Sequence, residues 1–182
     1  MEKKISLLQL AGSSTLWVRK NAEKLRPAIN KELESLTPGG VLVIDLEGIE
    51  AFDNSYANEL FGKTVLSLSN EYQNRFFIVE NLTDFTRENL VRELLYMKLI
   101  MIERNKGALQ LIGSIHPADS QTFELIKNSP QPVTAIELKD KLGINLTAVN
   151  ERLNKLAEMG LVMRDTSVSQ AGRQQYIYSA PK

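Results

Sequence analysis

The sequence has no cysteine and a single histidine, His116, among its 182 residues. Without cysteine there is no disulfide, no thiol nucleophile and no cysteine-ligated zinc site. One histidine leaves no histidine cluster for a metal and no choice of partners for a catalytic triad. We therefore expect a protein that is not an enzyme and that carries no metal and no cofactor.

Long hydrophobic runs and an excess of one charge are also missing. No apolar run approaches the roughly 18 residues of a membrane-spanning helix, and the apolar stretch after Lys4 is too short for a secretory signal peptide. The 22 Lys and Arg residues balance 22 Asp and Glu residues, which excludes a strongly basic coat for nucleic acid but allows a local basic surface. We expect a cytoplasmic globular protein that does not associate with membranes.

The first part of the chain alternates strand-like and helix-like stretches. Residues 41–46 form a continuous run rich in β-branched side chains, which is typical of a strand buried on both faces. Residues 21–36 carry apolar side chains at steps of three and four, as in an amphipathic helix, and Pro27 inside it indicates a kink or a late start. This alternation predicts an α/β fold with a mixed sheet. We expect strands at 5–10, 41–46, 75–79, 98–103 and 108–112, and helices at 21–36, 55–68 and 83–97.

The second part changes character after residue 113. Thr134, followed three residues later by Glu137, forms a capping-box pattern at a helix start, and Gly143 suits the left-handed end of that helix. We expect helices at 118–128, 134–142 and 146–159, then strands at 161–164 and 174–178 around a polar loop at 165–173. The fold class is therefore α/β followed by α+β, with one domain at 1–113 and a second at 114–182.

Two short helices joined by a glycine turn and followed by a β-ribbon are the plan of a winged helix-turn-helix. The segment LKDKLGI at 138–144 and the segment VNERLNKLAEMGLVMR at 149–164 resemble the winged helix of bacterial transcription regulators. The resemblance covers about the last 65 residues. It implies a second helix that enters the major groove of DNA and a wing over the adjacent backbone.

The outward residues of that helix and the arginines of the wing are the candidate DNA contacts. Asparagine can form a bidentate pair with adenine, and Thr, Lys and Arg can bind phosphates or base edges. The alternative is a winged helix used only for protein contact, since the second part has a net charge of only +1 and Glu151 lies on the reading helix. The expected contacts are Asn145, Thr147, Asn150, Arg152, Asn154, Lys155, Arg164 and Arg173.

The first part resembles a second known family. Residues 43–55, VIDLEGIEAFDNS, resemble the centre of a STAS domain, the fold of bacterial anti-sigma-factor antagonists, and residues 56–62, YANELFG, resemble the STAS-like variant. In the antagonists a serine at a helix start is phosphorylated and switches partner binding. Asp53, Asn54 and Ser55 fall on those positions, although Tyr56 replaces the usual Gly. The alternative for these three residues is a plain helix N-cap.

Together these patterns predict a transcription regulator in which the first domain senses or docks a partner protein and the second binds double-stranded DNA, with a homodimer as the expected assembly. The alternative is a protein-interaction switch of the anti-sigma type that does not touch DNA. Glu47, Glu50, Asp53 and Glu59 lie near one strand end and could suggest a carboxylate pair or a hard-cation site, but we interpret them as solvated acids around a helix N-terminus.

Overall fold

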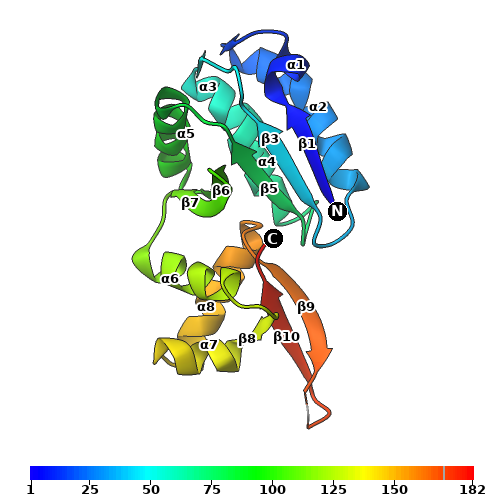
Figure 1. Cartoon of the computed structure of the whole chain (residues 1–182), viewed down its shortest axis with the longest axis vertical. Helices are drawn as coiled ribbons and strands as arrows, with labels where there is room; N and C mark the ends of the chain where they lie inside the picture. Colours follow the sequence, from blue (N-terminus) through cyan, green and yellow to red (C-terminus); the bar gives the residue numbers. More distant parts are fainter. Residues whose placement is uncertain (170) are drawn as a thin grey trace.

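The computed structural model describes residues 1–169 and 171–182. Figure 1 shows a sheet with helices in the N-terminal half of the chain and, below it, a bundle of helices with a long β-hairpin in the C-terminal half. The N-terminal segment (residues 1–113) and the C-terminal segment (residues 114–182) lie against each other, and both chain ends lie near their junction. This arrangement confirms the expected fold class, α/β with a mixed sheet followed by α+β.

The N-terminal segment is built on a five-stranded sheet in the order β1-β3-β5-β6-β7. The strands β1, β3, β5 and β6 run parallel to one another, and β6 and β7 form an antiparallel hairpin, so the sheet is mixed as predicted. A short parallel pair, β2 with β4, lies apart from the sheet. The strands are β1 (Glu2–Ser6), β2 (Thr15–Leu16), β3 (Val41–Asp45), β4 (Ala51–Phe52), β5 (Phe76–Glu80), β6 (Ile100–Asn105) and β7 (Ala108–Gly113).

The helices of this segment differ from the sequence prediction at the start of the chain. The strand expected at 5–10 is wrong beyond Ser6, because the Ser6 side chain accepts a hydrogen bond from the Gln9 N–H and caps a short helix that ends at the left-handed Gly12. The late start suggested for the next helix is also wrong, since it begins at Arg19 and continues through Pro27. The helices are α1 (Leu7–Ala11), α2 (Arg19–Ser35), α3 (Asn54–Ala57), the π-helical turn η1 (Asn58–Gly62), α4 (Lys63–Leu68) and α5 (Asp84–Met97).

The C-terminal segment contains three helices and a three-stranded antiparallel sheet in the order β8-β10-β9. The predicted capping box is confirmed: the Glu137 N–H donates to the Thr134 hydroxyl, and the Glu137 carboxylate accepts from the Thr134 N–H. The hairpin is longer than predicted, because residues 165–168 of the loop expected at 165–173 belong to its first strand; Gln170 lies outside the described residues. The elements are α6 (Pro117–Lys127), β8 (Val133–Thr134), α7 (Ala135–Leu142), α8 (Leu146–Glu158), β9 (Met163–Val168) and β10 (Gln174–Ser179).

The two faces of the N-terminal sheet have different covers. On one face, Leu42, Ile44, Phe77 and Val79 pack in a core with α2, η1, α4 and α5. On the other face, alternate residues of β3, β5 and β6 belong to one buried cluster with the core of the C-terminal segment, so the second half of the chain covers the face that the helices leave open. The sheet side chains in that shared cluster are Val41, Val43, Phe76, Ile78, Ile100 and Ile102.

The turn after α8 makes this contact closely. A Cβ atom built on Gly160 would lie 2.6 Å from the Leu68 side chain and 3.3 Å from the Arg75 carbonyl oxygen. Gly160 also has a φ of 66°, which side-chain-bearing residues rarely adopt. Glycine at this position therefore allows the end of α8 to press against the end of α4. None of the helices in the described part of the chain has the length and apolar content of a membrane span.

Tyr56 gives the N-terminal core a measurable pH dependence. Its side chain is 1% exposed, its hydroxyl has no hydrogen-bond partner among the described residues, and burial raises its pKa to about 12. The unfolded chain loses this proton near pH 10, so above that pH the free energy of unfolding should fall until the folded-state pKa is passed. At neutral pH we expect Tyr56→Phe to be as stable as the wild type or up to about 1 kcal/mol more stable, because it removes a buried hydroxyl without a partner. At alkaline pH the variant should lose less stability than the wild type.

Urea unfolding of both proteins at neutral pH and at about pH 11 measures this difference. Tyr72 and Tyr178 also have pKa values raised by burial, so the wild type and the variant share their contribution to the alkaline loss. An equal alkaline loss in the two proteins would contradict the assignment to Tyr56.

Candidate nucleic-acid interface

Helix α8 is anchored by its inner face and turns a polar face outward. Val149, Leu153 and Leu156 are fully buried against the rest of the C-terminal segment. The Asn145 side chain caps the helix, since its Oδ1 accepts a hydrogen bond from the Ala148 N–H at 2.8 Å. The residues of the opposite face are exposed: Asn145, Thr147, Asn150, Glu151 and Asn154.

Two predicted contact residues lie on the flank of this face. Arg152 and Lys155 are both half-buried. The Lys155 ammonium donates to Asp119 Oδ2 at 2.5 Å, and Asp119 on α6 is 4% exposed. Lys155 therefore joins α8 to α6 in this structure, and its charge is already balanced within the segment.

The hairpin brings a second group of predicted residues beside α8. The Arg164 guanidinium lies over the Tyr176 ring, 5.0 Å from its centroid, and Nη1 donates to Asn154 Oδ1 at 3.4 Å. This stacking fixes a planar cation next to the polar face of the helix. Arg173 is exposed on the same hairpin, just before β10 begins. The structure thus brings Asn154 and Arg164 together, while Arg173 lies farther along the hairpin.

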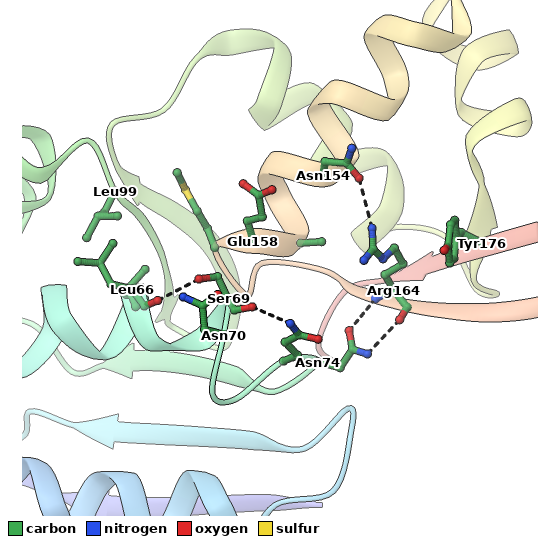
Figure 2. A pocket seen from close by; sticks show the side chains of 13 residues that line it. Leu66, Ser69, Asn70, Asn74, Leu99, Asn154, Glu158, Arg164 and Tyr176 are labelled. Atoms are coloured by element: carbon green, nitrogen blue, oxygen red, sulfur yellow. Dashed lines mark hydrogen bonds between the residues drawn. The ribbon is translucent and has the colours of Figure 1, made fainter.

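Asn74 of the N-terminal segment, which the sequence did not single out, holds the start of β9. Its Nδ2 donates to the Arg164 carbonyl oxygen and its Oδ1 accepts from the Arg164 N–H, both at 3.0 Å (Figure 2). The amide thereby pairs with the backbone of Arg164 as a neighbouring strand would. Asn74 lies in the left-handed region with a φ of 60°, which asparagine tolerates better than most residues. No local pattern indicates its partner, which lies 90 residues later in the chain.

The start of α3 forms a separate polar cluster around Asp53. Its Oδ1 accepts from the Tyr56 N–H and from the Ser55 hydroxyl, both at 2.7 Å, and its Oδ2 accepts from the Val18 N–H at 2.9 Å. Burial alone would raise the pKa of Asp53, but these hydrogen bonds together hold it below its ordinary value. Asp53 is therefore the N-cap of α3, with Asn54 exposed and Ser55 half-buried beside it.

An exposed apolar pair adjoins this cluster. Trp17 and Val18 are 47% and 56% exposed, so Trp17 is not part of the core. Val18 has a φ of 72°, an unusual backbone conformation for a β-branched residue, and its N–H is held by Asp53. We refer to Trp17, Val18, Asp53, Asn54 and Ser55 as the α3 surface.

The acidic residues near the strand end do not form a metal site. No group of three potential metal-ligating side chains occurs among residues 1–169 and 171–182. Glu59 is 1% exposed and pairs with Arg26 Nη1 at 2.7 Å and with Lys63 Nζ at 2.5 Å. Burial alone would raise the pKa of Glu59. The hydrogen bonds and charges of Lys63 and Arg26 outweigh that effect and hold this pKa below its ordinary value.

No protein-family model and no curated protein sequence matches the chain. Among solved structures, the chain is similar to one described as a possible transcriptional regulator from Methanosarcina mazei Go1, with a TM-score of 0.34 and 22% sequence identity. The match covers 37% of this chain and 57% of that one, so it spans little more than half of the solved protein.

Proposed function

We propose that this chain is a non-enzymatic transcription regulator whose C-terminal segment is a winged helix that binds duplex DNA. The observation that carries the proposal is the exposed polar face of α8, which lies beside a hairpin bearing Arg164 and Arg173. The N-terminal segment, which resembles STAS-like domains, would sense or dock a partner. The domain boundary near residue 113 belongs to the same proposal.

The residue types on α8 suit base-edge contacts in the major groove. Asn150 can pair with the N6 and N7 positions of adenine, and Thr147 can contact a phosphate or the methyl group of thymine. Glu151 can accept a hydrogen bond from the amino group of cytosine. The hairpin with Arg173 would then follow the adjacent backbone, as the wing does in proteins of this type.

The charge of the segment limits how tightly one copy can bind. Of its eight Lys and Arg residues, Lys127, Lys139 and Lys155 form ion pairs with acids of the same segment. Few cations then remain to neutralise phosphates, so affinity should depend on base contacts and on a second copy of the chain. A homodimer on two half-sites would double the number of phosphate contacts.

Capture of genomic fragments tests the proposal. Sheared genomic DNA from the source organism is bound to the immobilised chain at near-physiological salt and sequenced, with Thr147→Ala/Asn150→Ala as the binding-deficient variant and Gln9→Ala on α1 as the matched surface control. We expect discrete enriched sites for the wild type and the control, and a loss of at least about tenfold for the double variant, since each base contact contributes about 1–3 kcal/mol. Equal recovery by all three proteins would contradict sequence-specific binding through α8.

The α3 surface supports a second candidate function, a protein-interaction switch without DNA binding. Trp17 and Val18 are exposed next to Ser55, whose hydroxyl donates to Asp53. A phosphate on Ser55 would place two to three like charges side by side, displace the Asp53 carboxylate and release the Val18 N–H. Two results together would support this candidate function: no enriched site in the genomic capture, and a partner protein that binds the wild type but not Trp17→Ala.

A further inference from the structure

A groove of about 640 Å³ lies at the junction of the two segments (Figure 2). Its walls come from the end of α4 and the following turn on one side, and from the last turn of α8 and the start of β9 on the other. Val65, Leu66, Leu99 and Met159 supply the apolar part of the lining. The polar part is mostly carboxamides, with one arginine, one carboxylate and two hydroxyl-bearing residues: Asn70, Gln73, Asn74, Asn154, Arg164, Glu158, Ser69 and Tyr176.

The groove continues the polar face of α8 into the N-terminal segment. Asn154 lies one helical turn beyond Asn150, and its side chain enters the groove next to Arg164. A ligand that lies along the outer face of α8 would therefore meet Asn154, then the groove, and then Asn70 on the opposite wall. Such a ligand would therefore contact residues of both the N-terminal and the C-terminal segment.

Some hydrogen-bond donors of the groove already have an acceptor within the protein, and others do not. Gln73 Nε2 is bonded to the Ser69 carbonyl at 2.8 Å, and both polar atoms of the Asn74 amide are bonded to the backbone of Arg164. Within the described residues, the Asn70 amide and Asn154 Nδ2 have no such partner, and the Arg164 guanidinium makes a long hydrogen bond to Asn154 and lies beside the buried Tyr178 hydroxyl. Donors of three different elements thus face one space without an internal acceptor for most of their N–H groups.

The segments that carry these donors are held against one another. The paired hydrogen bonds of Asn74 tie the turn after α4 to β9, Gly160 brings the end of α8 against Leu68, and the Tyr176 ring supports Arg164. Segments that are already ordered lose little backbone conformational entropy when a ligand binds. The contacts between the two segments therefore fix the shape of the groove before a ligand binds.

From these contacts we infer that the groove binds the phosphate backbone of duplex DNA beside the α8 site, with Asn70 donating to a phosphate that Arg164 also contacts. The inference rests on the proposed function and extends it, because it makes the N-terminal segment part of the DNA interface. Neutral amide donors would compensate for the few free cations of the C-terminal segment. The Glu158 carboxylate repels phosphate, so it confines the backbone to the Arg164 side of the groove.

The test compares charge and hydrogen-bond variants of Asn70 by fluorescence anisotropy. The probe is a labelled duplex of about 30 base pairs that carries a site enriched in the genomic capture, in about 50 mM salt. We expect Asn70→Ala to weaken binding by about three- to tenfold and Asn70→Asp by more than about tenfold. Gln9→Glu, which adds the same charge on exposed α1, should stay within about twofold of the wild type.

The salt dependence of binding identifies the kind of contact. Asn70→Ala should leave the slope of log K against log salt unchanged, because an amide releases no counterion, whereas Arg164→Gln should reduce the slope by about 1. Wild-type affinity in Asn70→Asp, with binding still lost in Thr147→Ala/Asn150→Ala, would overturn the groove while leaving the proposed function intact. Absence of binding by the wild type would overturn both.

Discussion

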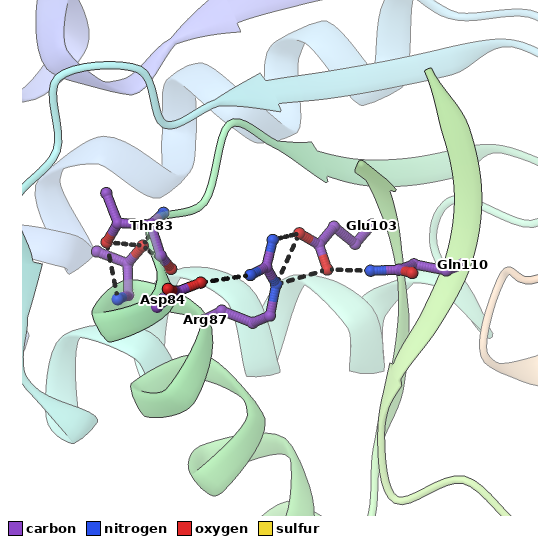
Figure 3. Close-up of polar contacts among 6 residues, drawn as sticks. Thr83, Asp84, Arg87, Glu103 and Gln110 are labelled. Carbon is purple, nitrogen blue, oxygen red and sulfur yellow. Dashed lines mark hydrogen bonds and ion pairs between the residues drawn. The ribbon is translucent and has the colours of Figure 1, made fainter. Parts of the chain in front are cut away.

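Replacing Arg87 by methionine is expected to lower the free energy of unfolding by about 3–5 kcal/mol. Arg87 on α5 donates three hydrogen bonds to Glu103 on β6 (Figure 3). Nη2 donates to Oε1 at 2.5 Å, and Nε donates to Oε1 at 2.9 Å and to Oε2 at 3.0 Å. Glu103 is 1% exposed, and Gln110 on β7 donates to its other side at 2.8 Å. Without Arg87, Gln110 would be the one remaining hydrogen-bond partner of the buried carboxylate among the described residues, and it is neutral.

A matched variant separates this pair from ordinary surface pairs. Arg92 on the same helix bonds to Glu88 at 2.7 Å, but both side chains are more than half exposed. Arg92→Met should therefore cost less than about 1 kcal/mol. Adding Glu103→Gln to Arg87→Met should restore part of the lost stability, because the buried charge is then removed. Urea unfolding measures all four proteins, and equal costs for Arg87→Met and Arg92→Met would contradict the assignment.

Truncating Ile78 is expected to destabilise both halves of the chain together. Ile78 lies on the central strand β5, is fully buried, and belongs to the cluster that the sheet shares with the C-terminal segment. Ile78→Ala should lower the free energy of unfolding by about 2–5 kcal/mol through lost burial and the cavity left behind. Ile136→Ala, at a position 58% exposed on α7, should change it by less than about 0.5 kcal/mol.

Two probes follow the halves separately in this experiment. Trp17 is the single tryptophan and reports on the N-terminal segment. Because the chain has no cysteine, a dye attached to Gln121→Cys on the exposed side of α6 reports on the C-terminal segment. We expect one transition midpoint for both probes in the wild type and a common lower midpoint in Ile78→Ala. Separate midpoints would contradict the view that the shared cluster joins the segments into one cooperative unit.

Local chemistry explains which parts of the fold were predictable. The run at 41–46 predicts a strand buried on both faces, and β3 is such a strand because helices cover one face and the C-terminal segment the other. The Thr134 capping box lies within four residues and was readable directly. The start of the chain was misread because a single serine cap outweighs a short apolar run that suits either a strand or a helix.

The candidate site was less predictable because its contacts are distant in sequence. The polar residues of α8 follow from helical periodicity; Thr147, Asn150 and Asn154 are exposed as expected, whereas Arg152 and Lys155 are half-buried. The pairing of Lys155 with Asp119 spans 36 residues, and that of Asn74 with Arg164 spans 90. No local pattern indicates such partners. The groove beside α8 is formed by residues of both segments, so it depends on contacts that no local sequence pattern encodes.

Mapping the interface on the chain itself tests the central claim, that α8 and the hairpin contact duplex DNA. Backbone amide spectra of the isotope-labelled 182-residue chain are recorded during titration with a duplex recovered in the genomic capture. The account predicts the largest shifts at residues 145–155 and at Arg164 and Arg173, with further shifts around Asn70. Shifts confined to the α3 surface, or spread evenly over the molecule, would contradict it.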